Sequence, residues 1–245
     1  MGLSLLLGTA VCAEAATISW TGAADGNWFN AANWSPALVP TSADAVVIDS
    51  NTTVSVSGAT SISFAALALG DAAGNFSPTL RLSAAENTSG SVTVYSRAKL
   101  QQDTNLQIVF GALNVMPGGL LTHTANSSAR SFLLNLSVTG DFNLQAGATI
   151  AANGQGYAGG TANGSGYGPG AGIYGGDGSG GGHGGAGGRG SSGALGGAAY
   201  DNATNPIDLG SGGGSSYSSM AGGAGGGAAL IAVGGTFSLN GVINA

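Results

Sequence analysis

The chain has 245 residues, of which only 7% are charged and 48 are glycine, and its formal net charge is −6. Because ordinary globular domains carry about a quarter charged residues, this composition favours an extracellular structural protein over a cytosolic enzyme. The eleven acidic and five basic residues are spread thinly and form no basic stripe that could neutralise phosphates, which argues against nucleic acid as a partner.

Residues 1–15 are predicted to be an export signal. Residues 2–12 are mostly apolar, and Ala13-Glu14-Ala15 provides the pattern of small residues that a signal peptidase recognises. No Lys or Arg precedes the apolar segment, so a disordered N-terminus is the alternative. The single cysteine, Cys12, lies inside this leader, so the mature chain has no disulfide and no thiolate metal ligand. No later apolar run reaches the roughly 18 residues that span a bilayer.

Residues 16–50 are predicted to form an N-terminal cap rich in tryptophan. All three tryptophans of the chain, Trp20, Trp28 and Trp34, lie in this segment, interleaved with turn residues. A large aromatic side chain buries roughly 150–250 Å², and the terminal units of stacked folds need an atypical cover. An exposed platform for stacking on sugars is the alternative, which the spacing disfavours because the three residues do not alternate along one strand face.

Short segments of alternating apolar and polar residues, separated by Gly, Ser, Asn and Asp, fill residues 51–153. Period-two patterning predicts strands with one buried face, and no stretch sustains helical spacing. The chain after the leader is therefore predicted to be all-β. The clearest segments are Val54–Val56, Leu67–Leu69, Leu80–Leu82, Val92–Val94, Leu106–Phe110, Leu113–Val115 and Leu134–Val138.

Two stretches superimpose at an offset of 29 residues, and a third copy lies at the C-terminal end. Successive turns of a solenoid place equivalent side chains in the same slots, so the repeat predicts a right-handed parallel β-helix rather than a sandwich. Residues 229–245 are expected to be a returning, truncated rung with an unpaired edge. The three copies are Val109, Gly111, Leu113, Val115, Gly118 and Leu121; Val138, Gly140, Phe142, Leu144, Gly147 and Ile150; and Val233, Gly235, Phe237, Leu239, Gly241 and Ile243.

Residues 154–228 read as a glycine-rich insertion between the second and third copies. They hold 32 of the 48 glycines, and glycine-rich chain loses the most entropy on ordering, which favours disorder. A bundle of extended three-fold glycine helices that hydrogen-bond sideways is the ordered alternative. The candidate recognition residues are the tyrosines of this segment, namely Tyr157, Tyr167, Tyr174, Tyr200 and Tyr217.

Patterns that would indicate catalysis, a metal or a cofactor are absent from the sequence. No Gly-Lys-Ser/Thr motif and no strand, glycine turn and helix occur in succession, so no phosphate site is predicted. His123 and His183 are far apart in the sequence and are interpreted as surface imidazoles. The scattered acids are interpreted as turn formers that accept hydrogen bonds from nearby backbone; they are Asp25, Asp44, Asp49, Asp71, Glu86, Asp103 and Asp141.

The opening segment carries a resemblance to a known family. Trp20-Thr-Gly22, Gly26-Asn27-Trp28, Asn33-Trp34, Pro40 and Asp44, followed by Leu67-Ala-Leu69-Gly70 and the later rungs, resemble passenger regions of bacterial autotransporter-type surface proteins and related secreted β-helix proteins. The resemblance covers roughly residues 17–152 and 229–245, of which the rungs are generic. It implies a cell-surface or secreted stalk, adhesin or matrix component.

These observations predict a non-enzymatic, exported surface or extracellular module in which a β-helix stalk displays a glycine-rich loop. Its expected partners are glycans, surface or matrix proteins, or further copies of itself, with no membrane span. Two alternatives stay open. A carbohydrate-active β-helix lyase or hydrolase requires two carboxylates, or a carboxylate and a base, in one groove, and a self-assembling matrix protein requires an insertion that associates with other copies.

Overall fold

A computed structural model describes residues 15–58, 60–202, 204–217 and 220–245, and these residues are nearly all β. They form eighteen strands and one short 3-10 helix, η1 (Ala31–Asn33). The predicted export signal lies outside the described residues except for Ala15. Within the described parts of the chain, no helix is long and apolar enough to cross a membrane.

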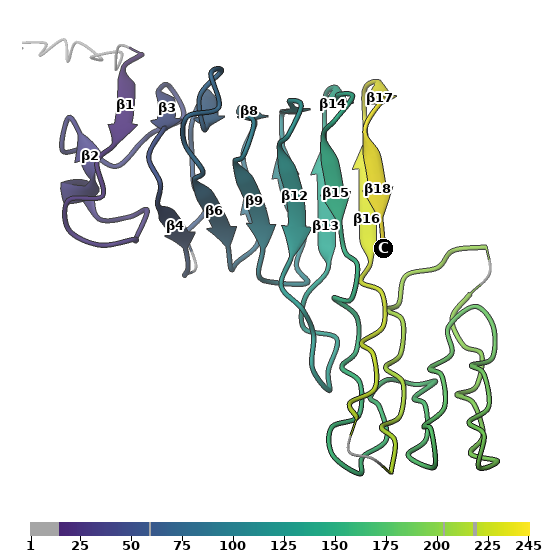
Figure 1. Cartoon of the computed structure of the whole chain (residues 1–245). Helices are drawn as coiled ribbons and strands as arrows, with labels where there is room; N and C mark the ends of the chain where they lie inside the picture. Colours follow the sequence, from purple (N-terminus) through teal and green to yellow (C-terminus); the bar gives the residue numbers. More distant parts are fainter. Residues whose placement is uncertain (1–14, 59, 203, 218–219) are drawn as a thin grey trace, which may run out of the picture.

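The strands form three sheets (Figure 1). In spatial order, sheet A contains β17 (Phe237–Leu239), β14 (Phe142–Leu144), β11 (Ala112–Val115), β8 (Ser91–Val94), β5 (Ala66–Leu69), β3 (Ala45–Ile48), β1 (Thr17–Trp20) and β2 (Trp34–Ser35). Sheet B contains β18 (Val242–Asn244), β15 (Thr149–Ala151), β12 (Leu120–His123), β9 (Lys99–Gln102), β6 (Thr79–Leu82) and β4 (Thr53–Val56). Sheet C contains β16 (Ala229–Val233), β13 (Leu134–Val138), β10 (Ile108–Phe110) and β7 (Glu86–Asn87).

The chain visits the three sheets in a repeating order. β10, β11 and β12 belong to sheets C, A and B, and the next two groups of three strands repeat that order. All strand pairings are parallel except that of β1 with β2. Each group of strands forms one layer, and the layers follow one another from the purple to the yellow end of the chain in Figure 1. This arrangement is compatible with the expected β-helix.

The core is built from columns of equivalent apolar side chains. In sheet A, Leu67, Val92, Leu113 and Phe142 occupy the same register position in successive layers, and each is at most 2% exposed. Along each strand, the residues that alternate with these core residues face outward, as a period of two predicts. Full burial of one such side chain contributes roughly 1.5–3 kcal/mol, so the repeated column is what holds the layers together.

The repeat offset of 29 residues holds in sheets A and B but not in sheet C. Val138 pairs with Phe110, so the expected equivalence of Val109 with Val138 is wrong. Three residues separate Val138 from the next core residue, Phe142, whereas two separate Phe110 from Leu113. The corner of the later layer is therefore longer by one residue, and the extra residue restores the register in sheet A.

The alternating segment Leu106–Phe110 was expected to place Leu106 in the core, but its strand begins later than the pattern indicates. Leu106 is 52% exposed, and strand β10 starts at Ile108. The carbonyl oxygen of Leu106 accepts a hydrogen bond from the Gln102 side chain at 2.6 Å, and the Thr104 hydroxyl accepts the Leu106 N–H at 3.1 Å. These local side-chain bonds hold the segment as a turn, and the apolar side chain faces solvent.

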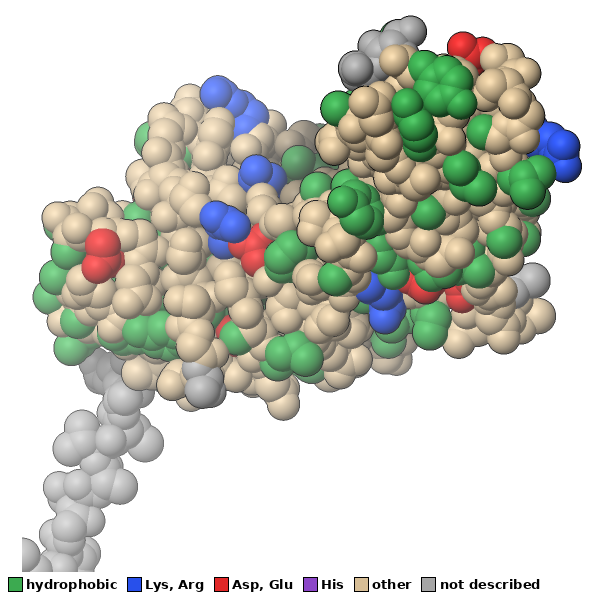
Figure 2. All heavy atoms as spheres, turned by 90° about the horizontal axis from the view of Figure 1, so that it is seen from below, with side chains coloured by type: hydrophobic (Ala, Val, Ile, Leu, Met, Phe, Trp, Pro, Cys, Tyr) green, Lys and Arg blue, Asp and Glu red, His purple; other side chains and the backbone are tan. Residues whose placement is uncertain are grey.

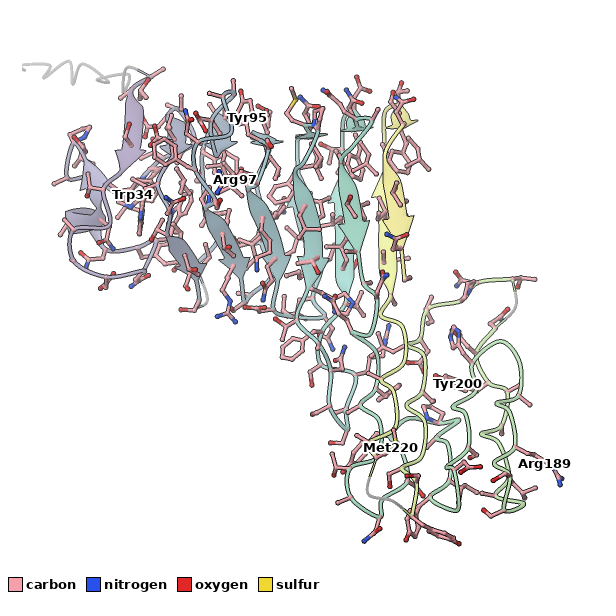
Figure 3. All side chains as sticks on the ribbon, in the orientation of Figure 1. Trp34, Tyr95, Arg97, Arg189, Tyr200 and Met220 are labelled. Carbon is pink, nitrogen blue, oxygen red and sulfur yellow. The ribbon has the colours of Figure 1, made fainter. Side chains whose placement is uncertain are left out.

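The three tryptophans lie together at the N-terminal end of the stack. Trp34 makes edge-to-face contacts with Trp20 at 4.8 Å and with Trp28 at 4.9 Å between ring centroids. All three are at most 4% exposed, and the Trp34 indole N–H donates to the Trp28 carbonyl at 2.8 Å. Figure 3 places Trp34 among the first layers. The geometry fits a cap and leaves no indole face open for a sugar, although β3, within residues 16–50, already forms part of a regular layer.

Among the described residues, no strand pairs with the outer side of the layer formed by β16, β17 and β18. Phe237, Leu239 and Ile243 are 38%, 51% and 41% exposed, whereas their partners in the preceding layer are 0% exposed. Phe237 stacks on Phe142 at 4.8 Å. Residues 229–245 include no charged side chain. We call this surface the uncovered last layer.

Residues 154–228, here called the glycine-rich bundle, form a compact body beside the last layers (Figure 1). The described residues of this segment contain no strand or helix. Its neighbouring backbone segments are joined by hydrogen bonds whose partners advance in steps of three residues, which is the period of the polyproline II helix. One such ladder runs from Gly210 N–H to Gly226 O (2.8 Å), Gly213 N–H to Gly223 O (2.9 Å) and Ser216 N–H to Met220 O (3.0 Å).

A second ladder in the bundle has the same period. It joins Ser211 N–H to Gly182 O (3.4 Å), Gly214 N–H to Ser179 O (2.9 Å) and Tyr217 N–H to Gly176 O (3.0 Å). Of the two alternatives for this segment, the structure has the ordered one. Sideways hydrogen bonding satisfies the backbone that folding buries, and it offsets part of the entropy lost by so many glycines.

Close backbone contact explains why the bundle contains so much glycine. A Cβ atom on Gly187 or Gly212 would lie less than 3.0 Å from a backbone carbonyl oxygen of a neighbouring segment. The buried polar side chains of the bundle are serines that bond the same backbone, for example Ser215 to the Gly164 N–H at 2.9 Å. The interior is therefore backbone and hydroxyl groups, unlike the apolar core of the stack.

Candidate functional site

The five candidate tyrosines do not form one surface. Tyr157 is buried at 7% exposure, whereas Tyr167 and Tyr217 are 46% and 62% exposed. Tyr217 makes an edge-to-face contact with Tyr174 at 5.1 Å. Tyr200, labelled in Figure 3, contacts His183 at 5.1 Å between ring centroids instead. The structure therefore separates the buried Tyr157, the pair of half-buried Tyr174 and exposed Tyr217, the exposed Tyr167, and Tyr200 beside a pocket.

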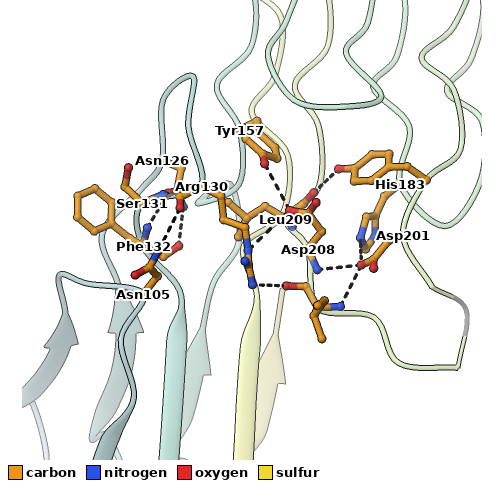
Figure 4. Close-up of polar contacts among 12 residues, drawn as sticks. Asn105, Asn126, Arg130, Ser131, Phe132, Tyr157, His183, Asp201, Asp208 and Leu209 are labelled. Atoms are coloured by element: carbon orange, nitrogen blue, oxygen red, sulfur yellow. Dashed lines mark hydrogen bonds and ion pairs between the residues drawn. The ribbon is translucent and has the colours of Figure 1, made fainter. Parts of the chain in front are cut away.

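Tyr157 belongs to the joint between the bundle and the stack. It packs with Leu133 and Leu209 in a small apolar cluster separate from the main core. Its hydroxyl hydrogen-bonds the Asp208 carboxylate at 3.4 Å, and burial followed by the charge of Asp208 raises the pKa of this phenol. Arg130 donates to the Ile207 carbonyl at 2.7 Å and lies 3.7 Å from Asp208 (Figure 4). Tyr157 is therefore a buried part of the joint between the bundle and the stack.

The loop that carries Arg130 is itself fixed to the stack. The side-chain Oδ1 atom of Asn126 accepts hydrogen bonds from the Ser131 and Phe132 N–H groups, both at 2.8 Å. The Asn126 amide nitrogen donates to the carbonyls of Phe132 and Gln155, also at 2.8 Å (Figure 4). One buried asparagine thus ties this loop to the point where the chain enters the bundle.

Asp201 organises the loop that borders a pocket of the bundle. It has a left-handed backbone with φ of 71°. Its carboxylate accepts hydrogen bonds from the Asn202, Ile207 and Asp208 N–H groups at 2.7, 3.0 and 2.8 Å. It also bonds His183 Nε2 at 3.1 Å. Backbone hydrogen bonds, of which the one from Asp208 has the largest effect, lower the pKa of Asp201 to about 2, so the carboxylate stays charged and fixes both the loop and the imidazole.

The pocket beside this loop has a volume of about 570 Å³. His183 and Tyr200 are in edge-to-face contact at 5.1 Å, and the Tyr200 hydroxyl donates to the Leu209 carbonyl and accepts a hydrogen bond from the Ser211 hydroxyl at 3.0 Å. Burial raises the pKa of the Tyr200 phenol. The lining residues are His183, Gly184, Ala199, Tyr200, Asp201, Asn202 and Pro206. The pocket thus combines an aromatic ring, small apolar groups and two fixed polar side chains.

A second depression, of about 430 Å³, lies on the outer face of sheet A. Its polar side chains include Thr93, Asn114, Asn143 and Ser238, which share one register column across four layers. Asp141 is the one carboxylate in its lining, and Asp141 Oδ1 accepts the Thr236 N–H at 2.8 Å. General acid and base catalysis needs a second titratable group within reach of the substrate, and this depression does not provide one.

The acidic residues are dispersed over the molecule. On the face that Figure 2 shows, a few red and blue groups, some of them side by side, lie on a surface that is mostly uncharged. In the parts of the chain that the structure describes, no group of three or more His, Cys, Asp or Glu side chains could hold a metal ion. Asp25 behaves as expected of a turn former, because hydrogen bonds from the Asn27 N–H and from the side chains of Asn30 and Asn33 lower its pKa.

Glu86 is an exception to the turn interpretation of the acids. It lies in β7, is 1% exposed, and pairs in register with the core residue Ile108. Its Oε2 atom accepts the Ile62 N–H at 2.7 Å, while Oε1 has no hydrogen-bond partner. Burial raises the pKa of Glu86 to about 7, opposed in part by the bond from Ile62. Asp103 also departs from the turn interpretation, because its carboxylate forms an ion pair with Arg81 at 2.6 Å.

His123 is not the surface imidazole that was expected, whereas His183 is partly exposed. His123 is 1% exposed at the end of β12, its Nδ1 is 2.8 Å from the Thr124 carbonyl, and its Nε2 has no partner. Burial lowers the pKa of His123. His183 is paired with Asp201. The sequence separates Asp201 from His183 by a glycine-rich stretch without regular spacing, so no pattern signalled the pair.

No family model, curated protein or solved structure matches this chain. The resemblance of the Trp20, Trp28 and Trp34 segment to autotransporter passengers therefore rests on the residues themselves. The function has to be argued from the geometry of the stack, the joint, the bundle and the pocket.

Proposed function

We propose that the chain is a non-enzymatic, exported module of a bacterial cell surface or extracellular matrix. In this proposal the layered strands form a closed, right-handed parallel β-helix that acts as a stalk, and the glycine-rich bundle is the part presented to glycans or surface proteins. The repeating order of three parallel sheets supports the solenoid, and the strong preference of parallel crossovers for one hand supports its handedness.

The observation that carries the proposal is the fixed display of an ordered bundle. The bundle is anchored through the Tyr157, Leu133 and Leu209 cluster and the contacts of Arg130. On its surface it presents Tyr167 and Tyr217, which are 46% and 62% exposed. Exposed aromatic side chains held on a rigid support favour recognition because little conformational entropy is lost on binding. A low content of charge suits a module that works outside the cell.

The carbohydrate-active enzyme receives less support. Such chemistry uses a pair of carboxylates, or a carboxylate with a base, close to one bond of the substrate. Asp141 is the sole carboxylate in the depression of sheet A, and Glu86 is enclosed in the core. Asp201, beside the bundle pocket, has its oxygens engaged by three backbone N–H groups and His183. We therefore expect no release of reducing ends from polysaccharides.

Replacing Tyr167, Tyr174 and Tyr217 together by alanine tests the adhesive role. We expect retention on glycan-coated or matrix-coated surfaces to fall at least about tenfold, because aromatic anchors supply much of the energy at such contacts. The matched control is Tyr95→Ala, which removes a ring from the stack (Figure 3). Unchanged retention in the triple variant, with the bundle still folded, would remove the exposed tyrosines from recognition.

Self-assembly is a second candidate, favoured by one observation. The uncovered last layer presents unpaired strand edges together with Phe237, Leu239 and Ile243, all more than a third exposed. Exposed, uncharged strand edges are templates for pairing with another chain. At the other end, sheet A terminates in β2, a strand of two residues that pairs antiparallel with β1.

Sedimentation at several concentrations tests this second candidate. We expect the average mass of the wild-type chain to rise with concentration and the Leu239→Lys variant to stay closer to the monomer mass, because a charge on this layer opposes burial. Thr93→Lys, on the outer face of sheet A, is the matched control. A wild-type chain that remains monomeric at all concentrations contradicts assembly.

A further inference from the structure

The pocket beside Tyr200 is preformed. The Tyr200 ring is held at its hydroxyl by the Leu209 carbonyl and by the Ser211 hydroxyl, and its other neighbour is the imidazole of His183 at 5.1 Å. His183 is in turn held by Asp201, whose carboxylate is fixed by backbone N–H groups (Figure 4). A volume of about 570 Å³ lies within the range of small-ligand sites. Walls that are already fixed lower the entropic cost of binding.

The one charged side chain that lines this pocket is the carboxylate of Asp201. Asp201 accepts three backbone N–H groups in addition to His183. At the joint, Asp208 is paired with Arg130, and Arg130 also donates to the Ile207 carbonyl. No Lys or Arg is among the described lining residues. With one carboxylate and no cation in the lining, electrostatics disfavour an anionic ligand, and the Asp201 oxygens are already engaged within the protein.

The remaining chemistry of the lining is amphipathic. Tyr200, Ala199 and Pro206 provide ring and methylene surface, while His183 and Asn202 provide hydrogen-bonding atoms at its edge. The His183 side chain is 37% exposed, so it is open to solvent on the pocket side. Gly184 adds no side chain, and no atom lies within 4 Å of the position its Cβ would take, which leaves room for entry. An apolar face with polar groups at the rim is complementary to a sugar ring, which has C–H groups on its face and hydroxyls around its edge.

We propose that this pocket binds one residue of a neutral glycan, with Tyr200 as the packing surface and His183 and Asn202 as hydrogen-bonding partners of its hydroxyls. The inference rests on the proposed adhesive function and assigns a ligand class to one site within it. The site does not include Tyr174 and Tyr217, which contact each other at 5.1 Å between ring centroids and are not among the residues that line the pocket.

The test is titration of the full chain with defined oligosaccharide probes, with binding measured by calorimetry or NMR. The probes are tetrasaccharides of mannose, galactose and N-acetylglucosamine, with a galacturonic acid tetrasaccharide as the anionic comparison. We expect binding of at least one neutral probe, reduced at least tenfold in His183→Ala and in Tyr200→Leu. Tyr200→Phe keeps the ring and is expected to retain most of the affinity. Tyr217→Ala is the matched control and is expected to bind normally.

Three outcomes overturn the inference. Tighter binding of the anionic probe than of every neutral one contradicts the ligand class. Neutral binding that survives both His183→Ala and Tyr200→Leu, while hydrogen exchange shows a folded bundle, contradicts the site. No binding of any probe contradicts both. In each case, the adhesive function is still supported if retention on surfaces depends on Tyr167, Tyr174 and Tyr217. If the wild-type chain is not retained on any surface, that result counts against the adhesive function itself.

Discussion

Raising the pH from 5 to 8 is expected to lower the free energy of unfolding of the wild-type chain by about 3 kcal/mol more than that of the Glu86→Gln variant. The folded chain holds the Glu86 carboxyl with a pKa of about 7, against an ordinary value of 4.5. Because the folded state prefers the protonated form, the stabilisation is complete below pH 4.5 and is lost as the pH rises through 7. Urea unfolding at both pH values measures the difference.

The comparison with Glu86→Gln is needed because His123 acts in the opposite direction. Burial lowers its pKa below the ordinary 6.5, so its contribution is lost as the pH falls below that value. Both chains share this effect, which cancels in the difference. The Gln oxygen can still accept the Ile62 N–H that Glu86 accepts at 2.7 Å. Equal pH dependence of the two chains would show that Glu86 ionises normally and is not enclosed as described.

Replacing Gly187 by alanine is expected to destabilise the glycine-rich bundle by about 3 kcal/mol, the upper part of the range for overpacking a tight interior. The added Cβ would lie less than 3.0 Å from the Gly180 carbonyl oxygen, which is backbone and cannot move aside as a side chain can. Hydrogen exchange of bundle amides measures the effect, and the amides of the stack should keep their protection because the joint lies elsewhere.

The neighbouring residue provides the matched control. No atom lies within 4 Å of the position that a Cβ on Gly188 would take, and its φ lies outside the left-handed region. Gly188→Ala should therefore change protection little, or raise it slightly by restricting the unfolded chain. If both variants exchange alike, then close backbone packing is not what orders this segment, and its glycines have another explanation.

The fold could largely be predicted because it repeats. Leu67, Val92, Leu113 and Phe142 alternate with polar residues in the sequence and stack in one column, so a period of two and a recurrent spacing carried the information. The corner after Val138 escaped prediction because one extra residue there shifts the offset in sheet C without disturbing any apolar pattern. Leu106 was misplaced because side-chain hydrogen bonds from Gln102 and to Thr104 set the turn.

The site could be predicted only in part. The tyrosines of the insertion were identified by composition, but burial of Tyr157 and the pocket beside Tyr200 depend on how bare backbones pack, and glycine carries no pattern that fixes which segments become neighbours. The pairing of His183 with Asp201 and the enclosure of Glu86 are likewise tertiary contacts. The sequence on both sides of Glu86 has the same alternating pattern as the other strands, so nothing in it indicated that this carboxyl lies in the core.

The chain leaves the stack after Ala151 and returns at Ala229, and the layers on either side remain paired as if adjacent, with Val138 opposite Val233. At the crossing point the Gly227 N–H donates to the Ala152 carbonyl at 2.7 Å. Because the points at which the chain leaves and rejoins the stack are held this close, the stack can accept an unrelated domain whose own two ends lie close together. The scaffold is thereby modular: what it carries can be exchanged, in evolution or by transplantation in the laboratory, without redesign of the support.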